Sequence, residues 1–147
     1  MPRPSIYSPE HEEFREAVRA FLAKEVVPYF PEWERAGQVP HEFYARLGAF
    51  GLFGIRVPEE YGGAGRTSFL YSSVWTEECS RAGVSLGGAN THMNLVIPYI
   101  LRLGTPEQKR RWLPGMVAGE LMGCIAMTEP GSEEHTSELQ SLRHLVC

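Results

Sequence analysis

Apolar residues recur with the period of an α-helix along most of this chain. In the first clear case Phe14, Val18, Leu22 and Val26 fall on one face of a helix, with polar residues between them. Similar stripes, separated by proline and glycine, follow as far as residue 118. The pattern predicts a shorter helical piece around residues 32–35 and longer helices near residues 8–27, 40–50, 67–82, 90–103 and 105–118.

Two of these helices have clear N-terminal signals. Ser8 is a good N-cap, and Pro9 suits the first helical position. The run Thr105-Pro106-Glu107-Gln108 is a capping box, in which the Thr105 hydroxyl and the Gln108 side chain each satisfy a backbone N–H. These signals support a mainly α fold class, an antiparallel helical domain.

The pattern changes in one stretch, from Leu121 to Gly131. Residues Cys124 to Met127 are apolar on both faces, as in a buried strand, and Pro130-Gly131 ends the run. Thr128 then stands at the end of the strand, where its hydroxyl and its backbone N–H can meet a ligand. Periodicity alone also allows an alternative to a binding site at Thr128. In that interpretation the run is a buried strand that leaves a helical bundle and has no binding role.

Composition places the chain among ordinary globular proteins. It has 147 residues, 43% of them hydrophobic and 22% charged, which suits one domain with a real core. The net charge of −4 gives no basic footprint for nucleic acid. No apolar run approaches the ~20 residues of a membrane span, and the first residues lack the apolar region of a signal peptide. We therefore expect a cytoplasmic protein.

Candidate chemical groups are few. Cys79, Cys124 and Cys147 share no metal-like spacing, so we predict no metal site and expect small buried hydrophobic roles for them. Glu77 and Glu78 are adjacent carboxylates that could suggest acid–base chemistry. Because neighbours in a helix point about 100° apart, solvated or capping roles are expected for these two residues.

Small residues from Ser85 to Thr91 precede an apolar wall that begins at Leu95. Small side chains next to such a wall can leave a slot between helices. His92 lies within this region. A single interior histidine is more often a satisfied core residue than a ligand or a base.

Residues Thr128-Glu129-Pro130 resemble the Thr-Glu-Pro signature of the flavin-dependent acyl-CoA dehydrogenases. The resemblance covers roughly residues 7–131. Further motifs agree in order and spacing, namely Val57-Pro58-Glu59-Glu60-Tyr61-Gly62-Gly63-Ala64-Gly65, Glu77-Glu78, Gly104-Thr105-Pro106-Glu107-Gln108-Lys109, Leu113-Pro114 and Gly119-Glu120. The resemblance implies an N-terminal helical domain over residues 1–119 and, over residues 120–131, the first strand of an incomplete middle β-domain.

The resemblance also implies an activity, which is the α,β-dehydrogenation of an acyl-CoA thioester to a trans-2-enoyl-CoA with hydride transfer to N5 of FAD. By resemblance, backbone groups of Ile125 and Met127 contact the flavin, as do the hydroxyl and N–H of Thr128. In the family the matching helix lines the acyl-chain pocket, and it points to four substrate-binding residues: Gly88, Thr91, His92 and Leu95. Electron-transfer flavoprotein is the implied acceptor, and the intact protein is implied to be a homo-oligomer.

The resemblance assigns no catalytic residue within this chain. The family's catalytic glutamate comes from a C-terminal helical domain, so Glu129 is not the base. We expect the chain as given to be inactive, although the intact gene product is implied to be a dehydrogenase. Two alternatives stay open: a fragment of an acyl-CoA oxidase or flavin monooxygenase-like relative, or a non-catalytic helical binding module.

Residues 132–147 depart abruptly from the family pattern. The run from Ser132 to Ser141 resembles a translated short-read sequencing adapter, where the family continues with Gly, Ser and Asp. We interpret residues 132–147 as a non-native, adapter-like tail without evolved function, and we predict that it is unfolded or arbitrarily placed.

Overall fold

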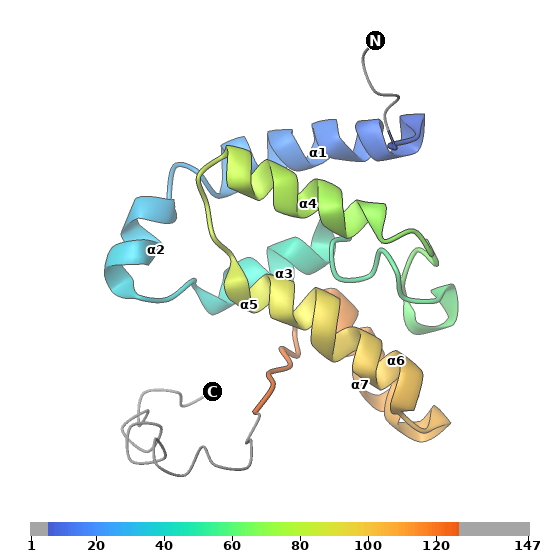
Figure 1. Ribbon diagram of the computed structural model, residues 1–147. Helices are drawn as coiled ribbons and strands as arrows, with labels where there is room; N and C mark the ends of the chain where they lie inside the picture. Colours follow the sequence, from blue (N-terminus) through green and yellow to red (C-terminus); the bar gives the residue numbers. More distant parts are fainter. Residues whose placement is uncertain (1–5, 127–147) are drawn as a thin grey trace, which may run out of the picture.

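The computed structural model describes residues 6–126 of the chain. Over this range the elements are helices joined by turns and loops (Figure 1). They are α1 (Pro9–Glu25), α2 (Phe30–Ala36), α3 (His41–Ala49), the 3₁₀ turn η1 (Glu59–Tyr61), α4 (Leu70–Arg81), α5 (Gly87–Thr91), the π-helix η2 (His92–Val96), α6 (Ile97–Leu103) and α7 (Pro106–Ala118). The predicted mainly α fold class is confirmed. The predicted tail from Ser132 lies outside the described residues.

The helix boundaries follow the signals in the sequence. Ser8 is the N-cap of α1, as predicted. At the start of α7 the Thr105 Oγ1 accepts the N–H of Gln108 at 3.3 Å, and the Thr105 N–H donates to the Gln108 side chain at 2.8 Å. The helix α4 begins at Leu70, whose N–H donates to the Ser68 hydroxyl at 3.2 Å. Local side-chain bonds therefore set where these helices start.

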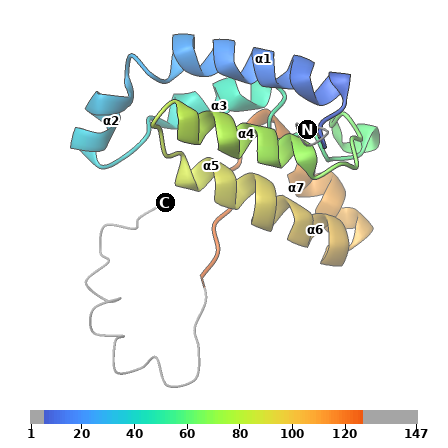
Figure 2. The ribbon, with the colours of Figure 1, turned by 45° about the horizontal axis from the view of Figure 1, so that its top comes forward.

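Helices α1 and α4 lie side by side and run in the same direction (Figure 1 and Figure 2). Near their starts the rings of His11 and Tyr71 lie 4.5 Å apart, and farther along both helices Arg19 binds Glu78. This pair departs from the predicted antiparallel arrangement because α2, α3 and a loop return the chain to the start of α1 before α4 begins. Helices α6 and α7, by contrast, are consecutive and form a hairpin.

One hydrophobic core joins the helices. Trp75 of α4 is completely buried, and its indole N–H donates to Asn90 Oδ1 of α5 at 3.0 Å. The other large core residues come from most of the helices and from the loop after α3: Val18, Leu22, Phe43, Leu47, Leu52, Phe53, Met93, Ile97, Leu113 and Met116. The stripe predicted for α1 is part of this core.

Two of the three cysteines lie in the described range. Cys79 is buried, as predicted, and burial raises the pKa of its thiol to about 12. Cys124 is exposed, so its predicted buried role is wrong. It follows α7 in a segment that has left the core. Cys147 lies outside the described residues.

Helices α3 and α7 cross with their backbones in direct contact. A Cβ atom on Gly48 would lie 2.1 Å from the carbonyl oxygen of Ala118, and one on Gly119 would lie 2.1 Å from the carbonyl oxygen of Tyr44. Gly119 also ends α7 with a φ of +74°. The crossing therefore requires glycine at both positions, and it fixes where the chain leaves α7.

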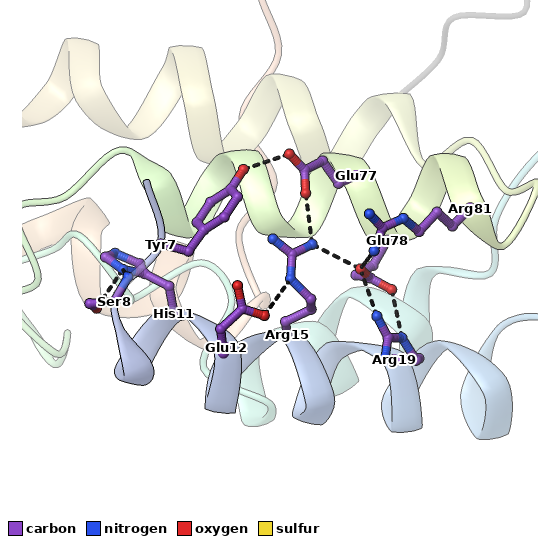
Figure 3. Close-up of polar contacts among 9 residues, drawn as sticks. All are labelled: Tyr7, Ser8, His11, Glu12, Arg15, Arg19, Glu77, Glu78 and Arg81. Atoms are coloured by element: carbon purple, nitrogen blue, oxygen red, sulfur yellow. Dashed lines mark hydrogen bonds and ion pairs between the residues drawn. The ribbon is translucent and has the colours of Figure 1, made fainter. Parts of the chain in front are cut away.

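A buried ion-pair network connects α1 to α4 (Figure 3). The guanidinium of Arg15 donates through Nη1 to Glu78 Oε1 at 2.9 Å and to Glu77 Oε2 at 2.7 Å. Glu78 also accepts from Arg19 Nε at 2.9 Å and from Arg81 Nη1 at 2.7 Å. The side chains at the centre are well buried, with 8% of Arg15 and 2% of Glu78 exposed.

The solvated or capping role expected for Glu78 is therefore wrong, whereas Glu77 pairs with Arg15 and still has 41% of its side chain exposed. Although the two carboxylates point in different directions, Arg15 reaches both, because its Nη1 carries two N–H groups that point apart. The hydrogen bond from Arg19, together with that from Arg15, lowers the pKa of Glu78 to about 2 against burial, which raises it. Hydrogen bonds from Tyr7 and Arg15 likewise hold the pKa of Glu77 below its usual value, so neither carboxyl group is suited to proton transfer at neutral pH.

Candidate functional site

The segment with the predicted flavin contacts leaves the end of α7 and passes the helical run 87–103 (Figure 1). The N–H of Leu121 still donates to the carbonyl of Gly115 at 3.1 Å, and residues 122–126 are irregular. The predicted strand from Cys124 to Met127 is absent in its described part, residues 124–126. A strand needs a paired neighbour, and residues 6–126 contain no other strand.

His92 joins this segment to the helical run. Its Nδ1 accepts the backbone N–H of Gly123 at 3.0 Å, and its Nε2 donates to the carbonyl of Met116 at 3.0 Å. The ring is completely buried, and the ring of Phe53 meets it edge-on at 4.7 Å. The predicted substrate-binding helix and the predicted flavin-binding segment are therefore in direct contact.

These two bonds define the state of the His92 ring. An amide N–H can only donate, so Nδ1 carries no proton, and a carbonyl can only accept, so Nε2 carries one. Burial lowers the pKa of His92, against the hydrogen bond to Met116, which raises it. The ring is therefore that of a neutral interior histidine with both nitrogens hydrogen-bonded.

Gly123 allows the segment to approach η2 closely. A Cβ atom at this position would lie 2.4 Å from Val96 Cγ1 and 3.3 Å from Met116 Cε. Next to it is a hollow of about 270 Å³, lined by Val96, Ile100, Trp112, Met116, Leu121, Met122 and Gly123. The segment therefore follows a tight path along an apolar surface.

Replacing Gly123 by alanine should force this path to change. We expect the free energy of unfolding to fall by about 1–3 kcal/mol, the usual cost of overpacking next to a stiff β-branched side chain. Chemical denaturation measures the change. Gly87→Ala is the matched control, because a Cβ atom there meets nothing within 4 Å. An equal effect of the two substitutions would contradict the tight approach at Gly123.

The remaining predicted substrate residues lie along the run formed by α5 and η2. Gly88 is exposed, and a Cβ atom on it would lie 2.9 Å from the Tyr44 hydroxyl. Thr91 is half-buried at the end of α5. Leu95 is 46% exposed and borders a hollow of about 410 Å³ on the outer side of α6. The structure thus places these residues on one helical run, where they differ in how far they are exposed to solvent.

This run is π-helical at its centre, where the sequence predicts an ordinary helix. The N–H of Ile97 donates to the carbonyl of His92, five residues back. Pro98 has no N–H to offer the carbonyl of Asn94, which weakens the ordinary register just after the π-helix. Short π-helical segments occur frequently at functional sites. Here the segment begins at His92.

The flavin-contacting residues are only partly described. Ile125 is 36% exposed, and its neighbours Cys124 and Ala126 are exposed too. Met127 and Thr128 lie outside the described residues. The partners of His92 were not predicted: Gly123 could have been suspected as a glycine within an apparent strand, whereas the carbonyl of Met116 gives no signal in sequence.

No group of three His, Cys, Asp or Glu side chains within residues 6–126 could hold a metal ion. In the same part of the chain no helix is long and apolar enough to cross a membrane.

Comparison with known proteins adds to this geometry. Residues 8–120 match the family model described as the N-terminal domain of acyl-CoA dehydrogenase. The rat mitochondrial long-chain specific acyl-CoA dehydrogenase is 43% identical over 142 residues, which cover 94% of this chain and 31% of that protein. The chain thus spans about a third of the length of such relatives.

Solved structures show the same relationship. The acyl-CoA dehydrogenase of Geobacillus kaustophilus matches with a TM-score of 0.80 and 46% identity, over 86% of this chain and 33% of that one. A glutaryl-CoA dehydrogenase of Mycobacterium smegmatis in complex with FADH2 matches with a TM-score of 0.72 and 26% identity, over 84% of this chain and 32% of that one.

Proposed function

The chain belongs to the acyl-CoA dehydrogenase family, and from this premise we propose that it supplies the helical wall of a flavin-dependent site that dehydrogenates acyl-CoA thioesters. We place the helical domain at residues 1–119 and the start of the β-domain at residues 120–131, with residues 132–147 as a non-native tail. The catalytic base belongs to a region of the family beyond this chain.

The contact between His92 and Gly123 is the observation that carries this proposal. A dehydrogenase has to hold the α,β-carbons of its substrate against the flavin, so the residues that bind the two ligands must be close. The Nδ1 of His92 lies 3.0 Å from the N of Gly123, although 31 positions separate them in the chain. The run that we propose to bind the substrate thus lies against the segment that leads to Thr128.

The exposed segment after Gly123 fits a flat cofactor. Residues 124–126 are exposed next to the fully buried wall at His92, so a planar ring can lie along their backbone. When bound, FAD supplies the acceptor for the hydride. Ile125 and Met127 would offer backbone groups to the ring, and Thr128 would donate from its hydroxyl and N–H, where a preorganised donor stabilises developing negative charge.

The names of the relatives support the proposed substrate class, since they range from long-chain acyl-CoA to glutaryl-CoA dehydrogenases. We propose that Gly88, Thr91 and Leu95 line the acyl chain and that His92 supports them from below. Electron-transfer flavoprotein is the proposed acceptor, and a homo-oligomer is the proposed assembly of the longer protein.

A chimera tests the proposal. Residues 6–131 of this chain would replace the matching third of the Geobacillus kaustophilus enzyme, next to the unaltered chain of 147 residues. We expect the chimera to bind FAD and to reduce a dye in the presence of acyl-CoA, and the shorter chain to do neither. A chimera that folds but ignores every acyl-CoA tried would refute the proposal, and hydrogen peroxide in place of dye reduction would indicate an oxidase.

Thr128→Ala in the chimera should weaken flavin reduction by about 1.5–3 kcal/mol, or roughly 10- to 150-fold in rate, because a hydrogen bond to a charged group is lost. Stopped-flow absorbance of the flavin measures this rate. Thr128→Ser is the matched control, since it keeps the hydroxyl. Equal rates for the two variants would show that the hydroxyl has no part in flavin reduction.

A further inference from the structure

We propose that His92 is a positioning residue whose two hydrogen bonds fix the path of the chain between α7 and the Thr128-Glu129-Pro130 signature. What the signature binds rests on the proposed function above. The positioning itself rests on contacts within residues 6–126. His92 does not touch a ligand itself, because its ring has no exposed surface.

The ring connects three parts of the chain. His92 opens η2, its Nε2–H binds the carbonyl of Met116 in the last turn of α7, and its Nδ1 binds the N–H of Gly123. The carbonyl of Met116 also accepts the N–H of Gly119, the glycine that ends α7. One side chain thus links the end of a helix to the chain four residues farther on.

A space-filling role alone does not account for this arrangement. Leucine would fill much of the same volume but would leave the N–H of Gly123 without its acceptor, and an unpaired polar group is costly where water is excluded. Both partners of His92 are backbone groups, so the bonds specify a chain path rather than a side-chain network. The close approach of Gly123 to Val96 is a second contact that restricts the position of Gly123.

Anchoring Gly123 limits where the signature can lie. Thr128 is five positions beyond Gly123 in the sequence, and an extended chain advances at most ~3.6 Å per residue. Thr128 therefore lies within roughly 18 Å of the anchor in any conformation. If the bond between His92 and Gly123 were lost, the segment after Gly123 would have more conformational freedom. Ligand binding would then have to order this segment, at a cost in binding free energy.

The test uses the full chain of 147 residues without flavin, labelled with ¹⁵N and followed by NMR. In the unaltered chain we expect a neutral His92 ring protonated at Nε2 and a Gly123 amide that exchanges slowly. His92→Leu should raise the exchange rate of the Gly123 amide about tenfold, relative to amides of α1, as expected for a lost hydrogen bond. His92→Gln offers a donor and an acceptor and should restore most of the protection.

A pH titration of the unaltered chain makes the test independent of whether His92→Leu folds. The contacts described for the ring, which are the ring of Phe53, the carbonyl of Met116 and the N–H of Gly123, are uncharged. A proton on Nδ1 would face the N–H of Gly123, so their bond must break when the ring is charged. The amide signal of Gly123 should therefore shift with the same midpoint as the ring of His92.

Two results would overturn the assignment: a Gly123 amide equally protected in His92→Leu, or a Gly123 signal that does not follow the titration of His92. Because these measurements contain no flavin, they succeed or fail separately from the chimera. A chimera that binds no flavin would refute the proposed function. It would not alter the exchange of Gly123.

Discussion

Glu78→Ala is expected to lower the free energy of unfolding by about 3–5 kcal/mol, because it leaves Arg15 charged and buried without its main partner. Glu78 accepts hydrogen bonds from Arg15, Arg19 and Arg81, and it is the most buried carboxylate of the network. Domains of this size are stable by only about 5–15 kcal/mol. The variant should therefore be partly unfolded under mild denaturing conditions.

Urea denaturation followed by circular dichroism measures this loss. The matched control is Glu107→Ala, which removes an exposed ion pair to Arg110 and should cost far less, because water screens exposed charges. If the two variants lost equal free energy of unfolding, the buried network at Glu78 would contribute no more to stability than an exposed ion pair.

The same carboxylate gives the stability a pH dependence. The pKa of Glu78 is about 2 in the folded chain against an ordinary value of 4.5, so the unfolded state takes up a proton first as the pH falls. The contribution of Glu78 is fully present above about pH 4.5 and is lost as the pH falls toward 2. Glu78→Gln should flatten the stability curve over this window.

Gly119→Ala is expected to cost about 2–5 kcal/mol. Two effects add: a side chain at a φ of +74° strains the backbone by about 1–2 kcal/mol, and the new Cβ atom would lie 2.1 Å from the carbonyl oxygen of Tyr44. Because that neighbour is backbone, α3 and α7 have to move apart to make room.

Gly37→Ala separates these two effects. Gly37 ends α2 with a φ of +71°, and a Cβ atom there meets nothing within 4 Å, so only the backbone strain applies. The difference between the two variants in thermal or urea unfolding measures the helix crossing alone. If Gly119→Ala were no worse than Gly37→Ala, the close contact of α3 with α7 would be wrong.

Local signals explain which parts of the fold could be predicted from the sequence. The stripe from Phe14 to Val26 and the capping box at Thr105 depend on neighbours within a few positions, and both appear as predicted. The network at Glu78 could not be predicted, since its partners on α1 lie 59 to 63 positions away and only the fold brings them together. Because Glu78 is buried, it binds arginines inside the domain and does not have the solvated role expected from the sequence.

The candidate site shows the same limit. The family resemblance pointed to His92 and Ile125 as separate members of a pocket. The bond from Gly123 to His92 is a long-range backbone contact, and neither the helical period nor the spacing of motifs contains it. The strand predicted at Cys124 failed in its described part for a related reason, because strand formation depends on a partner and not on the apolar run alone.

The parallel pairing of α1 with α4 has a consequence for the order in which the domain assembles. The hairpin of α6 and α7 closes over a few residues, whereas α1 docks on α4 through contacts between residues 59 to 63 positions apart. Closing a long loop is entropically costly before its contacts form, so we expect the hairpin to form early and the docking of α1 to come late. Glu78→Ala should then chiefly accelerate unfolding and leave the refolding rate almost unchanged, which stopped-flow measurements over a range of urea concentrations can test.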